Sequence, residues 1–84
     1  MRPHKTLRLI RDGSRNVHFQ DLIRLAEGFG FRVVRINGSH HMLSRAGVPK
    51  LLNFQDMNGM AKPYQVRQLL RWVEQYNLKL EDEP

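Results

Sequence analysis

The segment Asn37-Gly38-Ser39-His40-His41 places an imidazole beside an expected reversal of the chain. Asn-Gly between two short apolar runs predicts a β-hairpin, because both central residues of a type I′ turn need a positive φ. Histidine can accept and donate a proton near neutral pH, so a histidine held at a turn is a candidate for general acid–base chemistry. The alternative interpretation is a surface histidine that merely follows a turn.

A second polar side chain is expected near this histidine. A two-residue loop at Asn37-Gly38 pairs Ile36 with Ser39 and places Arg35 directly opposite His40. Residues that are directly opposite on neighbouring strands share a face of the sheet. We therefore expect Gly38, Ser39 and Arg35 to support His40, with Ser39 and nearby backbone N–H groups orienting a bound phosphate.

The sequence does not predict a metal site. His40 and His41 are adjacent in an expected strand, so their side chains point to opposite faces and cannot share a metal ion. The chain contains no cysteine and no spacing of His, Asp and Glu typical of a metal site. We expect a site that works without a metal or another cofactor.

The charge of the chain favours a polyanionic partner. The formal net charge is +6 over 84 residues, and three of the eight acidic residues lie together at positions 81–83. This balance favours nucleic acid first and an anionic membrane surface second. The basic residues expected to contact a nucleic acid are Arg32, Arg45, Lys50, Lys62, Arg67 and Arg71. A solvated helix face is an equally open interpretation of the Arg67 and Arg71 pair.

Targeting signals are not apparent in the sequence. No apolar run approaches the roughly 20 residues that a membrane span requires. The charged N-terminus lacks a following apolar segment, so we do not expect a signal peptide. The lack of cysteine fits a reducing compartment, and we expect a cytoplasmic protein without membrane contact.

The elements that must position His40 follow from hydrophobic periodicity. Apolar spacing predicts a helix over 18–29 and a second helix that begins at Pro63. Between them, β-branched residues and turn signals predict strands over 31–36, 39–45 and 50–54. This order is α-β-β-β-α, an α+β fold of two layers in which the opposite sheet face, or its edge, stays open to a ligand.

The ends of the chain are expected to differ from this central unit. Residues 1–16 form an N-terminal extension, in which 6–11 is either a short helix or an extended arm. Residues 17–77 form one domain, because a chain of this length has room for only one small core. Residues 78–84 form a polar, acidic tail that we expect to be frayed.

The layout over residues 17–76 resembles the HicA family of toxin–antitoxin systems, also called YcfA-like proteins. The matching parts are Gly28-Phe29-Gly30-Phe31, the strand 32–36, Gly38-Ser39-His40 and the closing helix from Lys62 to Leu70. The resemblance implies a double-stranded-RNA-binding-domain-like fold and an RNA-cleaving toxin that a HicB antitoxin inhibits. The functional histidine of the family falls on His40.

The chain departs from the family pattern in two places. Many members carry Pro-Arg-His near the start of the third strand, whereas Val48-Pro49-Lys50-Leu51 has no histidine. The extension through Asn16 is also longer than in minimal members. The first difference leaves any second histidine of the site open.

Two hypotheses follow from these observations. The first is a toxin of a type II system that acts as a metal-independent mRNA interferase, an endoribonuclease whose catalytic residue is His40. The alternative is a non-catalytic RNA-binding module of the same fold. A DNA-contacting protein is a weaker third hypothesis, because the predicted helices are separated by strands and do not form a helix-turn-helix. The oligomeric state stays open.

Overall fold

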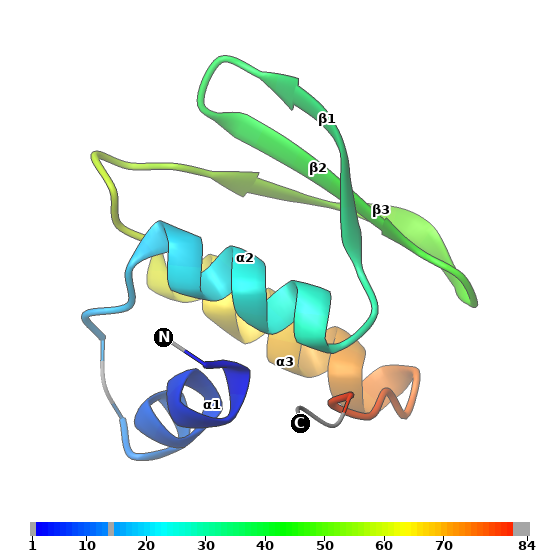
Figure 1. Ribbon diagram of the computed structural model, residues 1–84, viewed down its shortest axis with the longest axis horizontal. Helices are drawn as coiled ribbons and strands as arrows, with labels where there is room; N and C mark the ends of the chain where they lie inside the picture. Colours follow the sequence, from blue (N-terminus) through cyan, green and yellow to red (C-terminus); the bar gives the residue numbers. More distant parts are fainter. Residues whose placement is uncertain (1, 14, 82–84) are drawn as a thin grey trace.

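A three-stranded antiparallel sheet covered on one face by helices forms the protein (Figure 1). The computed structural model describes residues 2–13 and 15–81. Their elements are α1 (Pro3–Arg11), α2 (Phe19–Gly28), β1 (Arg32–Asn37), β2 (His40–Arg45), β3 (Val48–Gln55) and α3 (Pro63–Gln75). The predicted α-β-β-β-α order and the α+β class are confirmed, and α1 precedes them.

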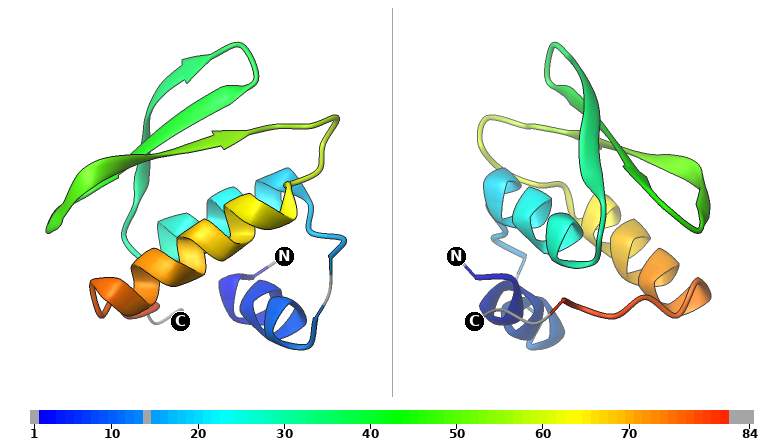
Figure 2. Two further views of the ribbon diagram at one scale, coloured as in Figure 1. Left: turned by 180° about the vertical axis from the view of Figure 1, so that it is seen from behind. Right: turned by 45° about the vertical axis from the view of Figure 1, so that its right-hand side comes forward.

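The elements form layers. Helices α2 and α3 lie side by side against one face of the sheet, and α1 lies on the far side of these two helices (Figures 1 and 2). The strand order in the sheet is β1-β2-β3, so β2 is central. Within residues 2–13 and 15–81, no helix covers the outer face of the sheet, one of the two surfaces that the sequence leaves open to a ligand (Figures 1 and 2).

The core between the sheet and the helices explains why these segments fold as they do. The largest fully buried apolar side chains come from both layers and are Phe19, Leu22, Leu25, Leu43, Leu52, Phe54 and Leu69. In α2 they recur at helical spacing, and in β3 the buried Leu52 and Phe54 flank the exposed Asn53. Pro63 occupies the first turn of α3, where its missing N–H costs no hydrogen bond.

No helix in residues 2–13 and 15–81 is long and apolar enough to cross a membrane.

The N-terminal segment packs as a helix. Of the two interpretations left open for residues 6–11, the helix is confirmed, and it begins earlier, at Pro3. Pro3 and Thr6 are buried, and Leu7 and Ile10 pack against the core. Its exposed side is rich in arginine and lysine. The apolar side of this amphipathic helix therefore attaches the segment to the domain.

The expectation of a frayed C-terminal tail is wrong for residues 78–81. Leu78 is buried, and Leu80 packs against the core close to Gly28. The backbone N–H of Glu81 donates to the carbonyl oxygen of Gly28 at 2.7 Å. The two leucines gain enough by burial to order the segment despite its charged neighbours. Asp82 and Glu83 of the predicted tail lie outside the described residues.

The hairpin before His40 has a different register from the predicted one. Asn37 pairs with His40, so the two turn residues are Gly38 and Ser39. Gly38 has a φ of 61°, and neither Asn37 nor Ser39 has a positive φ. A positive φ at the first central residue alone is the pattern of a type II′ turn, which favours glycine there. The predicted type I′ turn at Asn37-Gly38 is wrong, because the chain uses the overlapping Gly-Ser signal instead.

This register changes the neighbour of His40. Arg35 lies opposite Met42, not opposite His40. The pairing moves by two residues, so Arg35 and His40 keep the same face of the sheet but become diagonal neighbours. Diagonal neighbours are separated by about 7–8 Å between Cα atoms, against about 5 Å for direct partners. A contact between the two side chains is therefore not imposed by the strand pairing.

A β-bulge in β1 decides which way Arg35 points. The pairing shifts between Val33 and Arg35, so Val34 is an extra residue with no partner of its own. Val33 pairs with the buried Leu43 and packs against the core. Without the extra residue, alternation would direct Arg35 toward the helices as well. The bulge therefore allows a core-facing Val33 and an outward-facing Arg35 in one short strand.

Candidate active site

His40 is exposed at the start of β2, on the outer face of the sheet. Its Nδ1 atom lies 3.2 Å from Oδ1 of Asn53 on β3. An amide oxygen only accepts hydrogen bonds, so this contact requires the hydrogen of the neutral ring to be on Nδ1. The lone pair is then on Nε2, the nitrogen that is free to take a proton from a ligand. The arrangement orients the imidazole and selects its tautomer.

The turn before His40 is attached to β3 by Ser39. Its carbonyl oxygen accepts from the backbone N–H of Asp56 at 2.8 Å. Its hydroxyl oxygen accepts from Nε2 of Gln55 at 3.3 Å. Because Gln55 is also the β3 partner of His40, the strand end and the turn are held together. The Gly38–Ser39 turn is thus attached to β3 at the point where β2 begins with His40.

His41 belongs to the other face of the sheet. Its ring packs edge-on against Phe19 of α2, with centroids 4.8 Å apart. Its Nδ1 lies 3.4 Å from the carbonyl oxygen of Ser39. The prediction that His40 and His41 point to opposite faces is in accord with this geometry, and His41 has a packing role. Within residues 2–13 and 15–81, no group of three or more His, Asp or Glu side chains is placed to hold a metal ion.

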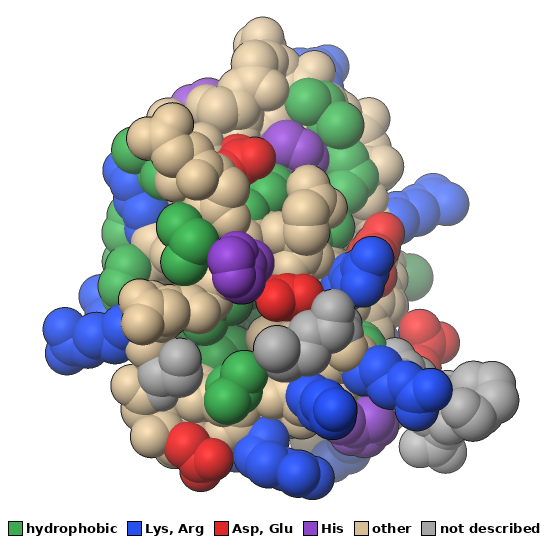
Figure 3. Space-filling model, turned by 60° about the vertical axis from the view of Figure 1, so that its left-hand side comes forward, with side chains coloured by type: hydrophobic (Ala, Val, Ile, Leu, Met, Phe, Trp, Pro, Cys, Tyr) green, Lys and Arg blue, Asp and Glu red, His purple; other side chains and the backbone are tan. Residues whose placement is uncertain are grey.

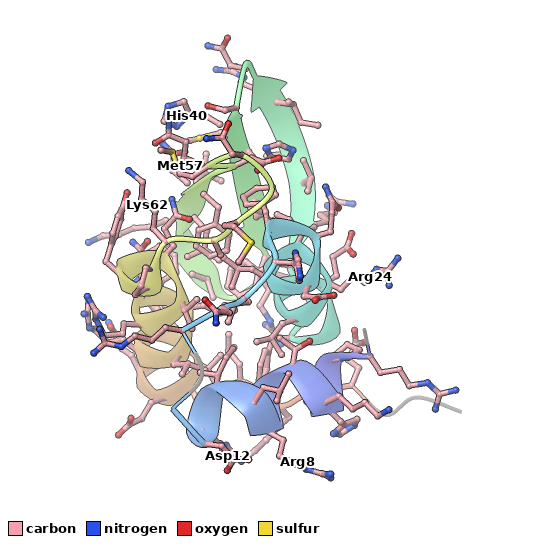
Figure 4. The ribbon with its side chains drawn as sticks, turned by 90° about the vertical axis from the view of Figure 1, so that its left-hand side faces the viewer. Arg8, Asp12, Arg24, His40, Met57 and Lys62 are labelled. Carbon is pink, nitrogen blue, oxygen red and sulfur yellow. The ribbon has the colours of Figure 1, made fainter. Side chains whose placement is uncertain are left out.

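Lys62, one of the predicted basic residues, lies on the same side of the molecule as His40 (Figure 4). Figure 4 places His40, Met57 and Lys62 one below another along that side. Lys62 immediately precedes α3, and its Nζ lies 5.7 Å from the centre of the Tyr64 ring. The loop after β3 returns the chain to this side, and Asp56 stabilises it by accepting the N–H of Gly59 at 2.7 Å.

The other predicted RNA-binding residues are not gathered around His40. Arg32 pairs with Ser44, and Arg45 pairs with Val48, so both lie at the end of the sheet opposite to His40. Lys50 lies near the same end, two residues after Val48. Arg67 and Arg71 are exposed on α3. Figure 3 likewise shows lysine and arginine side chains at several separate places around one face.

Arg45 has a structural role that its charge did not predict. Its Nε donates to the carbonyl oxygen of Phe29 at 2.6 Å, and its Nη1 donates to that of Ala46 at 2.6 Å. Gly30 has a φ of 95°, and a Cβ built there would lie 2.8 Å from the Arg45 Nε. The glycine therefore permits the turn after α2 and the close approach of the guanidinium. Arg45 joins the α2–β1 turn to the end of β2.

The comparison with protein families decides how this arrangement is classified. Residues 19–74 match the family model described as HicA toxin of bacterial toxin-antitoxin. The match covers more than half of the 84 residues. The chain belongs to the HicA toxin family. A search of curated proteins and a search of solved structures each gave no match.

Family membership supports a toxin role in a toxin–antitoxin system and implies an antitoxin partner. The region matched to HicA toxins begins with α2 and ends just before the end of α3. It therefore includes the hairpin with His40, Asn53 on β3 and Lys62. Helix α1 and the C-terminal segment 78–81 lie outside it. The double-stranded-RNA-binding-domain-like order expected for a HicA toxin is present over the matched part.

Asn53 and Gln55 are the site residues that the sequence analysis missed. Both belong to β3, and their contacts with His40 and Ser39 depend on the β2–β3 register. The available signal is the alternation in β3, where the buried Leu52 and Phe54 are interleaved with Asn53 and Gln55. Polar residues at outward positions of a strand next to His40 are candidates for its hydrogen-bond partners.

Proposed function

We propose that this toxin is a metal-independent endoribonuclease that cleaves mRNA and uses His40 as its general acid–base residue. The observation that carries the proposal is the exposed imidazole with Nδ1 held 3.2 Å from Asn53 Oδ1. An oriented histidine with an accessible Nε2 is what proton transfer to or from RNA requires. Its place in Gly38-Ser39-His40, within the matched family region, supports the same assignment.

The reaction needs no group that RNA and the chain do not supply. Nε2 of His40 takes the proton of a ribose 2′-OH, and the 2′-oxygen attacks the adjacent phosphorus. The bond from phosphorus to the 5′-oxygen breaks, and that oxygen receives a proton from a general acid. The products are a 2′,3′-cyclic phosphate and a 5′-hydroxyl end. The protonated His40 can return its proton in this step, since a single histidine serves both roles in turn.

Charge that develops on the phosphate needs stabilising donors. Lys62 lies on the same side of the molecule as His40, and its ammonium group is one candidate donor (Figure 4). Arg35 shares the outer face of the sheet with His40 as a diagonal neighbour and supplies a second cation. Backbone N–H groups at the Gly38–Ser39 turn are further donors for the phosphate oxygens.

The proposal predicts a strict requirement for the nucleophile. An RNA oligonucleotide is expected to be cleaved in excess EDTA, and the same sequence made with 2′-deoxyribose is expected to remain intact. The measurement is gel separation of the products, with a test for a 2′,3′-cyclic phosphate end. Cleavage of the deoxy substrate would contradict the mechanism, because its 2′-carbon carries no attacking oxygen. Dependence on a divalent ion would contradict metal independence.

Asn53 is a positioning residue in this proposal. Asn53→Ala is expected to lower kcat by about 10-fold, since a side-chain hydrogen bond contributes about 1–1.5 kcal/mol. Asn53→Asp retains the acceptor and adds a negative charge that stabilises the imidazolium. The pH–rate profile of this second variant is therefore expected to move to higher pH. An unchanged profile together with an unchanged kcat in Asn53→Ala would remove Asn53 from the site.

The partners follow from the family and from this reaction. We expect the antitoxin to be a HicB-like protein, and the cytoplasm, which contains mRNA, to be the compartment. The alternative function is a non-catalytic RNA-binding module of the same fold. It is distinguished by an RNA that stays intact and binds equally well to the wild type and to His40→Ala.

A further inference from the structure

The boundary between α1 and α3 carries three exposed arginines. Arg11 is the last residue of α1, Arg15 follows it in the connection to α2, and Arg67 lies in the first half of α3. We call this boundary the α1–α3 seam. A pocket of about 130 Å³ opens there, with Arg15 and Arg67 both in its lining. A neighbouring pocket along the seam includes Arg11.

The seam continues from the site around His40. Pro63 lines the pocket of Arg15 and Arg67, and it directly follows Lys62 in the chain. Lys62 lies on the same side of the molecule as His40 (Figure 4). A cationic path therefore leads from His40 past Lys62 to Arg67 and Arg15. Glu74 and Lys79, which line the second pocket, mark the far end of the seam.

The lining of the pocket suits one nucleotide unit. Its walls include the apolar side chains of Ile10, Val17 and Val66, beside the two guanidinium groups. Unpaired bases bind in apolar pockets and stack on the planes of guanidinium groups. Guanidinium groups also neutralise the charge of phosphate. The molecule measures 31 × 29 × 25 Å, so a strand that reaches both His40 and the seam must span several nucleotides.

We propose that the α1–α3 seam binds the backbone of single-stranded RNA at nucleotides several positions away from the phosphate at His40. The inference rests on RNA as the ligand in the proposed function. It adds a binding surface that includes residues outside the family-matched region, because Arg11 and Arg15 precede residue 19. Continuity with His40 favours RNA over an acidic protein segment, since one RNA strand can occupy both places at once.

The test compares two variants that lose the same charge. Arg11→Gln/Arg15→Gln removes two guanidinium groups from the seam. Arg8→Gln/Arg24→Gln removes two exposed groups that extend away from the body on sides other than that of Lys62 (Figure 4). Both are made in His40→Ala, so that the probe stays intact. Their affinities are measured by fluorescence anisotropy with poly-uridine RNAs of about 4 and about 16 nucleotides, the range of site sizes for small single-strand-binding domains.

The seam variant is expected to bind the longer RNA roughly 10- to 25-fold more weakly at about 0.1 M salt, with a log–log salt slope reduced by about 1.4. The control variant is expected to stay within about 2-fold of its parent, and the short RNA is expected to bind all three alike. Equal losses in both variants would overturn the seam, because they would reflect net charge alone. Unchanged RNA affinity with weakened antitoxin binding would also overturn it and would assign the seam to a protein partner.

The rate of catalysis is measured separately from RNA binding at the seam. With His40 intact, the rate of cleavage of a saturating short RNA is measured for the same two variant pairs. If the short RNA is cleaved but the seam variant binds the long RNA as tightly as its parent, this inference is overturned and the proposed function stays in place. If the seam variant binds the long RNA more weakly but no RNA is cleaved, the inference is supported and the catalytic role of His40 is rejected. No binding of either RNA overturns both.

Discussion

Replacing His40 with alanine is expected to lower the rate of RNA cleavage by about 10²–10⁴-fold, the range that general acid–base catalysis supplies. The imidazole is exposed and contacts Asn53 at its Nδ1, so its loss removes a proton-transfer group with little effect on the core. The measurement is the single-turnover cleavage rate of a defined RNA in excess EDTA. Thermal unfolding of the variant within a few degrees of the wild type shows that the fold is retained.

His18 provides the matched control for this experiment. It is also an exposed histidine, and it precedes α2 without a side-chain hydrogen bond to the helix end. His18→Ala is expected to cleave at the wild-type rate, because the residue lies outside the proposed site. Equal rates in wild type, His18→Ala and His40→Ala would mean that the cleavage does not use His40.

The largest expected loss of stability comes from Phe54. This ring is fully buried in β3, between Asn53 and Gln55, the two residues that hold His40 and Ser39. Phe54→Ala is expected to lower the free energy of unfolding by about 3–5 kcal/mol, from lost burial and the cavity that remains. The total free energy of unfolding of a small domain is about 5–15 kcal/mol, so this variant is expected to be close to unfolding.

Urea denaturation measures that loss, with Leu51→Ala as the control. Leu51 belongs to the same strand but is 47% exposed on the sheet. Its replacement is expected to change the free energy of unfolding by less than about 0.5 kcal/mol, as at most exposed positions. Similar losses in the two variants would contradict the placement of Phe54 in the core. In Phe54→Ala we also expect weaker catalysis at temperatures where the variant is still folded.

The helices and strands were predictable because apolar spacing and burial are linked directly. Helix α2 was expected over 18–29 and is present at Phe19–Gly28, and α3 begins at Pro63 as expected. The turn at Asn37-Gly38-Ser39 carries two overlapping hairpin signals, Asn-Gly and Gly-Ser. Local sequence does not choose between them, whereas the pairing of Val33 with Leu43 and the attachment of Ser39 to β3 do.

The supporting residues of the candidate site were harder to predict than His40 itself. Asn53 contacts His40 from the neighbouring strand, and the number of residues between them in the chain does not predict that contact. The basic residues were predicted by residue type alone. The fold places three of them at the end of the sheet opposite to His40, and the others on α3 or just before it. Arg45 in particular uses its guanidinium to bind two backbone carbonyls. Charge indicates the class of partner, while the topology decides which cations can act together.

The bulge at Val34 also bears on how the protein behaves at high concentration. β1 is an edge strand, and Val34 and Ile36 are 50% and 61% exposed. A regular apolar edge of this kind offers a template for strand addition by a second copy, the first step of sheet-driven aggregation. The extra residue interrupts the hydrogen-bonding repeat of that edge, and Arg32 and Arg35 add like charge to it. The extra valine thus makes this edge a poorer template for strand addition while it directs an arginine outward.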